Sequence, residues 1–284
     1  MKRVMVIKAR VLSPFGKGWH SSASPWFILA AALLLLCLCY TFLLTRGALN
    51  ASTVQMEQWL LGRPITRADC VLLEWRNVGN ALFILLGTIL LGVVCMLLGY
   101  RWPVLPSLVA LLFICLVCEG TGKVVLRQPI PQAVSASMPA LGCPQIYTQP
   151  SSARLSAAAG MWWNIPPASQ EVVERIHALS EQPLLSEWYY RARSYPGGHA
   201  MRGSFLGILV CWFCWRHIKR RAIRVPLMAL ALLVAFGVGF IQFYIGAHLI
   251  TDTIAGYLLG IAAACCAIGL LLLNAPRQQR AAPS

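Results

Sequence analysis

Acidic residues are scarce in this sequence, and charge of either sign is low. The 284 residues include nine Asp and Glu against 24 Lys and Arg, and charged residues make up only 12% of the chain. A water-soluble domain is about one-quarter charged. This chain is instead 58% hydrophobic, with a mean hydropathy of +0.66. These values exclude a single water-soluble core and predict a membrane protein.

The sequence also lacks the pattern of a nucleic-acid-binding protein, although its formal net charge is +15. Such proteins gather Lys and Arg in a patch or stripe on one face. Here no basic stripe is interleaved with aromatic residues, and the basic residues bracket apolar runs. Positive charge beside membrane spans is typical of loops that stay in the cytoplasm. We therefore expect no nucleic-acid partner.

The eleven cysteines do not indicate a metal or redox site. Two pairs have C-x-x-C spacing, but a zinc or redox site needs a companion pair or nearby histidines. Most of the cysteines fall in predicted spans and are interpreted as small apolar helix residues: Cys37, Cys39, Cys95, Cys115, Cys118, Cys211, Cys214, Cys265 and Cys266. Cys70 and Cys143 fall in predicted loops, where a disulfide between them stays open. No metal and no cofactor is expected.

Six apolar segments are long enough to cross a bilayer as helices, which takes about 20 residues each. They lie near 26–45, 80–99, 104–125, 200–215, 225–245 and 251–273. The fourth is short, so we expect it to begin earlier or to continue into the basic segment after it. The predicted fold class is therefore all-α: a polytopic membrane bundle of six transmembrane helices, forming a single domain over residues 1–284.

Basic residues predict the orientation of this bundle. The N-terminal tail, 1–25, the C-terminal tail, 274–284, and the turns after the second and fourth spans carry Lys or Arg but no Asp or Glu. All four segments lie on one side of a six-span protein, so both termini are predicted to be cytoplasmic. The loop 127–198 is then extracytoplasmic, and it is long for a connection between helices.

Ionisable residues at membrane depth are costly, and each is therefore a functional candidate. Here they gather in three segments at the outer ends of spans three to six: 119–129, 194–200 and 246–252. Lys123 and Arg127 are four residues apart, so on a helix their cations share a face. Glu119, four residues before Lys123, is expected to pair with it and is not counted as catalytic.

The other two segments supply an anion site and two imidazoles. Gly197 and Gly198 follow a proline at the start of a helix, where backbone N–H groups can hold an anion. His248 and Asp252 are four apart, so the carboxylate can accept from one imidazole nitrogen and leave the other free to attack. His199 can protonate a leaving oxygen. The pattern predicts a phosphoryl-transfer site without metal.

These residues resemble the motifs of the type 2 phosphatidic acid phosphatases (PAP2) and their vanadium haloperoxidase relatives. The family pattern has a Lys with an Arg-Pro downstream, a Pro-Ser-Gly-His, and a Ser-Arg followed by His-x-x-x-Asp. The residues that match it are Lys123, Arg127 and Pro129, then Pro196, Gly198 and His199, then His248 and Asp252. The resemblance implies that His248 becomes phosphorylated and that His199 assists the leaving group.

The sequence departs from the family pattern in spacing and in residue type. Lys123 and Arg127 are closer together than in the usual motif. Gly197 stands in place of the second-motif serine, Gln242 stands where the third-motif arginine is expected, and Ile241 replaces the serine before it. Arg202 lies three residues after His199 on the same helical face, and we expect it to replace the missing guanidinium. The predicted phosphate-binding residues are Lys123, Arg127, Gly197, Gly198 and Arg202, and the predicted catalytic residues are His248, His199 and Asp252.

The resemblance implies a membrane lipid-phosphate phosphatase that acts on a phospholipid or a polyprenyl (pyro)phosphate at the extracytoplasmic face. Its expected partners are that lipid and the bilayer, and its expected location is a bacterial inner membrane. A phosphotransferase with the same histidine site and a non-catalytic lipid-binding relative are the alternatives. A transporter is disfavoured because there are no internal repeats or discontinuous helices. The lipid and the oligomeric state stay open.

Overall fold

The computed structural model describes residues 23–49, 51–53, 55–56, 59, 72, 75–126, 195–244 and 248–275. These residues contain a short 3-10 helix and six long α-helices: η1 (Arg76–Gly79), α1 (Ser24–Thr45), α4 (Ala81–Leu97), α5 (Val104–Val125), α10 (Gly198–His217), α11 (Arg221–Tyr244) and α12 (Ile250–Leu273). No strand occurs among the residues described. The all-helical prediction is therefore confirmed for this part of the chain, and each long helix matches a predicted segment to within a few residues.

Some sequence predictions fall outside the described residues. Arg127, Cys70 and Cys143 lie there, as do nearly all of the loop 127–198 and most of both tails. The other nine cysteines all lie in long helices, α1, α4, α5, α10 and α12, and are free.

Four helices are long and apolar enough to cross a membrane: α1, α5, α11 and α12. Helix α4 is apolar but shorter, with 17 residues. Helix α10 has 20 residues but carries Arg202, Ser204 and three glycines among its apolar residues. The membrane fold is thus supported by the structure, whereas the count of six spans and the orientation of the termini stay predictions.

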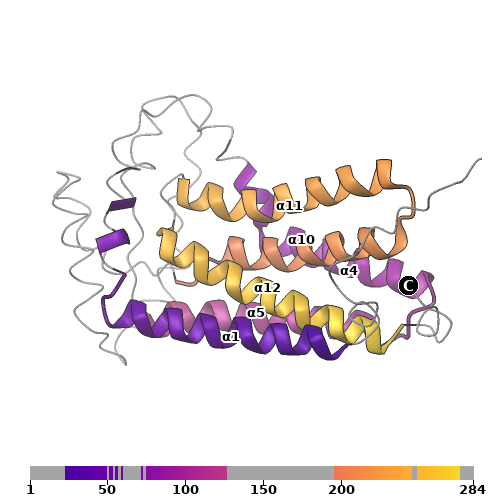
Figure 1. Cartoon of the computed structure of the whole chain (residues 1–284), viewed down its shortest axis with the longest axis horizontal. Helices are drawn as coiled ribbons and strands as arrows, with labels where there is room; N and C mark the ends of the chain where they lie inside the picture. The colour runs from indigo at the N-terminus through magenta and orange to yellow at the C-terminus, as the bar shows by residue number, and fades with distance from the viewer. Residues whose placement is uncertain are drawn as a thin grey trace, which may run out of the picture.

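The six helices lie side by side and run lengthwise in alternating directions (Figure 1). At one end of the bundle, the Thr41 hydroxyl near the end of α1 lies 2.5 Å from the Tyr195 hydroxyl, just before α10. At the opposite end, the Arg101 N–H before α5 donates to the Asn274 carbonyl after α12, at 3.1 Å. Helix α10 contacts α4, α5, α11 and α12, and α1 packs on α12. The central position of α10 means that its first turn is fixed by several neighbours.

Small residues allow α10 to approach its neighbours closely. A Cβ added at Gly239 in α11 would lie 2.6 Å from the Ala200 Cβ of α10. A Cβ at Gly260 in α12 would overlap the Met201 carbonyl oxygen. Helices in membranes associate through such close packing, because lipid provides no hydrophobic drive between them. These contacts hold the start of α10 in fixed register against α11 and the middle of α12.

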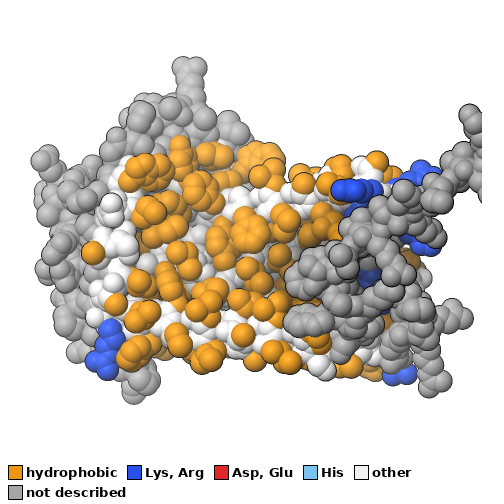
Figure 2. Space-filling view, viewed as in Figure 1, with side chains coloured by type: hydrophobic (Ala, Val, Ile, Leu, Met, Phe, Trp, Pro, Cys, Tyr) orange, Lys and Arg blue, Asp and Glu red, His pale blue; other side chains and the backbone are white. Residues whose placement is uncertain are grey.

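Large apolar side chains are exposed mainly on the outer helices. Examples are Leu35 at 62% on α1, Leu90 at 66% on α4 and Leu233 at 70% on α11. In the space-filling view an apolar surface covers the middle of the bundle, with Lys and Arg side chains near its two ends (Figure 2). This pattern suits a bundle whose outer helices face hydrocarbon and whose ends face water.

Candidate functional site

The three polar segments expected to converge do meet at one end of the bundle. The Gly197 N–H, at the start of α10, donates to the Asp252 carbonyl oxygen in the first turn of α12, at 2.8 Å. A Cβ at Gly122, near the end of α5, would overlap the Pro196 ring and lie 3.2 Å from the Tyr195 carbonyl oxygen. The end of α5 and the starts of α10 and α12 therefore form one cluster.

His248 lies in the bend before α12, and its side chain faces Asp252. The His248 Nδ1 lies 3.7 Å from the Asp252 Oδ2. This separation allows an ion pair with a protonated imidazole but is too long for a hydrogen bond. The His248 N–H donates to the Gln242 carbonyl at 3.1 Å, which ties the bend to the end of α11. The two residues are thus brought together as the sequence suggested, although without the expected hydrogen bond.

Asp252 also has a structural role at the start of α12. Its Oδ2 accepts from the Leu249 N–H at 3.1 Å, and a carboxylate in the first turn of a helix interacts favourably with the helix dipole. Its side chain is fully buried. Within the described residues, Asp252 Oδ1 and His248 Nδ1 are buried without a hydrogen-bond partner. Buried polar atoms are normally paired, so these two atoms are exceptions in the described part of the chain.

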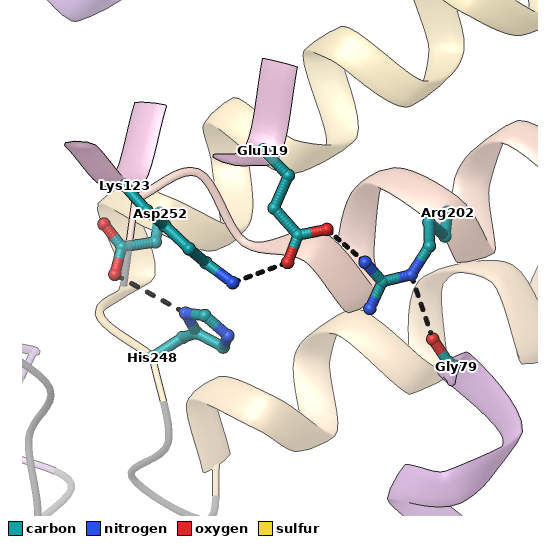
Figure 3. A network of polar contacts seen from close by, with 6 residues as sticks. All are labelled: Gly79, Glu119, Lys123, Arg202, His248 and Asp252. Carbon is teal, nitrogen blue, oxygen red and sulfur yellow. Dashed lines mark hydrogen bonds and ion pairs between the residues drawn. The ribbon is translucent and has the colours of Figure 1, made fainter. Parts of the chain in front are cut away.

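Glu119 joins the two cations of the site, as Figure 3 shows. Its Oε1 lies 2.6 Å from the Lys123 Nζ, and its Oε2 forms an ion pair with the Arg202 Nη1. The expected pairing of Glu119 with Lys123 is present. Arg202 and Glu119 are 7% and 11% exposed, whereas Lys123 is 36% exposed. The carboxylate therefore lies between a buried guanidinium and a more exposed ammonium.

Arg202 and His199 lie on the side of α10 that faces η1. The Arg202 Nε donates to the Gly79 carbonyl oxygen at 3.3 Å. A Cβ at Gly79 would lie 2.7 Å from the His199 Cδ2, so this imidazole packs directly against the η1 backbone. Sequence reasoning did not assign a role to Gly79, because its carbonyl contributes through the backbone and leaves no side-chain signal.

The two glycines at the start of α10 do not form an open anion site in this conformation. The Gly197 N–H already donates to Asp252. At Gly198, an added Cβ would overlap both carboxylate oxygens of Glu119. The absence of a side chain at Gly198 therefore lets the carboxylate approach the start of the helix closely. The sequence predicted a phosphate-binding site at the start of α10, whereas in the structure the Glu119 carboxylate lies there.

Gln242 continues the face of α11 that packs on α10. This face includes Ala235 and Gly239, which contact Gly207 and Ala200 of α10. Gln242 is 2% exposed, and its Nε2 has no hydrogen-bond partner among the described residues. Because Gln242 lies one turn beyond Gly239, this buried donor lies near the start of α10.

Glu119 is the residue whose importance sequence reasoning underestimated. Its spacing to Lys123 predicted the helical pair, but its contact with Arg202 crosses 83 residues of sequence and depends on how α5 packs against α10. The described residues contain no group of three or more His, Cys, Asp or Glu side chains that could hold a metal ion. What the cluster offers is two cations, two imidazoles and two carboxylates at one end of the bundle.

Comparison with protein families agrees with the motif pattern. The family model described as the PAP2 superfamily matches residues 103–274, which include α5, α10, α11 and α12. A similar solved structure is that of a transmembrane PAP2 type phosphatidylglycerolphosphate phosphatase from Bacillus subtilis. It is 15% identical, with a TM-score of 0.49, over 85% of this chain and 94% of that chain. No curated protein matches the chain.

Proposed function

Because this chain belongs to the PAP2 superfamily, we propose that it is a membrane lipid-phosphate phosphatase with His248 as its nucleophile. The substrate is a phospholipid or a polyprenyl (pyro)phosphate, reached from the extracytoplasmic face. The observation that carries the proposal is the placement of His248 beside buried Asp252, in one cluster with Lys123 and the start of α10. A histidine next to a carboxylate is the arrangement that activates an imidazole as a nucleophile.

In the proposed reaction the Nε2 of neutral His248 attacks phosphorus, since Nδ1 faces Asp252. An N–P bond forms as the bond from phosphorus to the lipid oxygen breaks, and the leaving oxygen takes a proton from His199. Water then gives a proton to His199 and attacks the phosphohistidine. This step breaks the N–P bond, releases phosphate and restores both histidines. Asp252 stabilises the positive charge that develops on the His248 ring.

Charge on the transferring group needs cations and hydrogen-bond donors that are already in place. Lys123 and Arg202 are the proposed cations, and Arg202 takes the part of the missing third-motif arginine. The Nε2 of buried Gln242, which has no hydrogen-bond partner among the residues described, is a further proposed donor to a phosphate oxygen. Arg127, Gly197 and Gly198 complete the proposed phosphate-binding set, although the Gly197 N–H must leave Asp252 before it can bind phosphate.

A second candidate is a non-catalytic relative that binds lipid headgroups or partner proteins. The observation that favours it is that both proposed cations are paired with Glu119 and the Gly197 amide with Asp252. Transfer of the phosphoryl group to a lipid or sugar hydroxyl is the other alternative, and it uses the same histidine. Retention of His248, His199 and Asp252 favours catalysis, because binding alone does not need two imidazoles.

The test is release of phosphate by the purified full-length protein in detergent, over a panel of lipid phosphates with chelator present. Wild type is compared with His248→Ala, and Gly120→Ala serves as a fold-matched control because a Cβ at Gly120 meets nothing within 4 Å. We expect release by wild type and the control, and none by His248→Ala. Equal release by His248→Ala would rule out the histidine mechanism. No release by any folded protein, with or without added acceptor alcohols, would favour the binding-only relative.

A further inference from the structure

An anion already occupies the cationic part of the candidate site. The Glu119 carboxylate contacts both Lys123, at 2.6 Å, and Arg202, one cation to each oxygen. A phosphate group held by the same two side chains would use the same ammonium and guanidinium donors. Because an oxyanion binds such donors with directional, charge-assisted hydrogen bonds, the carboxylate and a phosphate compete for them.

The carboxylate also lies at the start of α10. Both of its oxygens lie where a Cβ of Gly198 would stand. A helix start attracts anions through its free N–H groups and its dipole. Glu119 therefore occupies two groups that are expected to hold a phosphate, an ammonium and a guanidinium, and it lies against the first residue of α10.

The charge count of the cluster points the same way. Lys123 and Arg202 supply two positive charges, and Glu119 and Asp252 supply two negative charges, so these four sum to zero. A protonated His199, the proposed proton donor, adds a single positive charge. A phosphate monoester adds about −1.5 to −2 at neutral pH. Binding it without moving Glu119 would place a dianion beside two carboxylates, which raises its free energy. Release of Lys123 and Arg202 from Glu119 therefore favours binding of a phosphate.

We propose that Glu119 is an internal competitor for phosphate, and that a substrate binds by displacing its carboxylate from Lys123 and Arg202. This inference rests on the proposed function and deepens it. Displacement weakens the binding of every phosphate by a similar amount. A lipid phosphate, concentrated in the bilayer and bound also through its chains, still occupies the site. Inorganic phosphate, the reaction product, has no such chains and leaves readily.

A purely structural role for Glu119 predicts a different behaviour. If the carboxylate only tied α5 to α10, its loss would loosen Lys123 and Arg202 and weaken phosphate binding. Competition predicts tighter binding, because the same loss frees both cations. The sign of the change separates the two roles, and general destabilisation of the bundle does not produce tighter binding.

The first experiment measures the Kd of inorganic phosphate by calorimetry on the full chain in detergent, for wild type, Glu119→Gln and Gly120→Ala. We expect the Kd to fall about tenfold or more in Glu119→Gln, equivalent to about 1.4 kcal/mol, and to stay unchanged in Gly120→Ala. If the glutamine variant does not fold, Glu119→Asp is measured in its place. Its shorter side chain does not reach both cations, so a smaller decrease in the phosphate Kd is expected. A Kd that is unchanged or higher in the folded Glu119 variants would overturn the proposal.

Turnover supplies an independent measurement. For release from a lipid phosphate, Glu119→Gln is expected to lower the KM and the inhibition constant of inorganic phosphate together, without raising kcat. The two proposals then fail in different ways. Loss of His248-dependent release in every variant would refute the phosphatase, whereas an unchanged phosphate Kd would refute the competition.

Discussion

Arg202 and Lys123 share one carboxylate, but the structure predicts very different consequences for their removal. The perturbation is Arg202→Met compared with Lys123→Met, which each remove one cation and keep an unbranched apolar side chain. The Arg202–Glu119 pair is nearly buried, at 7% and 11% exposure, whereas Lys123 is 36% exposed. Removing one partner of a buried pair typically costs about 3–5 kcal/mol, whereas an exposed pair contributes about 0–1 kcal/mol.

Since Lys123 still partners Glu119 in Arg202→Met, we take the lower value, about 3 kcal/mol. For Lys123→Met we expect about 1 kcal/mol or less. The difference of about 2 kcal/mol corresponds to roughly 4–8 °C in Tm, from the relation for chains somewhat shorter than this one. The larger effect of Arg202 also includes the loss of its hydrogen bond to Gly79.

The assay is thermal unfolding in detergent, followed by a maleimide dye that reacts with cysteines as they become accessible. The native structure suits this readout, because five of the described cysteines are buried: Cys37, Cys95, Cys115, Cys214 and Cys265. A Glu119→Gln background supplies the control, since the difference between the two Met variants should shrink once the shared carboxylate is gone. Equal decreases in Tm for the two single variants would refute the reasoning from burial.

Two further predictions concern the packing that holds the site. Gly260→Ala places a Cβ against the Met201 carbonyl oxygen, so we expect a loss of about 1–3 kcal/mol in stability by the same thermal assay, whereas Gly120→Ala, in open space, should lose none. Tyr195→Phe removes the contact with Thr41 and should cost about 1 kcal/mol. Burial raises the pKa of the Tyr195 phenol, so this contribution should be constant below the unfolded-state value of about pH 10 and be lost as the pH rises further. A decrease of the Tyr195 contribution already at neutral pH would contradict this account.

Hydrophobicity predicted the helices well because each long apolar run is a local property of the sequence. Helix α5 begins at Val104 and ends at Val125, as expected, and α12 begins one residue earlier than predicted. The fourth segment extends beyond 200–215 at both ends, as expected, and the added residues Gly198, His199, Arg216 and His217 are not apolar. Because polar residues occupy the helix ends, the boundaries of a span cannot be located from hydropathy alone.

The site was predictable where contacts are local in sequence and less so where they are not. The spacing of four residues placed Glu119 beside Lys123 and His248 beside Asp252, and both pairs are present. The contact of Glu119 with Arg202 depends on the packing of two helices. The hydrogen bond from the Gly197 N–H to the Asp252 carbonyl oxygen depends on the close approach of two helix starts. Neither contact can be predicted from the spacing of residues in the sequence.

Helix α10 begins within the candidate site and contacts four other helices along its 20 residues. Selection for folding and selection for activity therefore act on the same short stretch of the gene. A substitution there affects several helix–helix interfaces at once, so few single substitutions are expected to be tolerated. Outer helices such as α1 and α4, which expose many of their side chains, have more freedom to vary. New substrate preferences are thus expected to arise by changes around α10, while its own sequence drifts slowly.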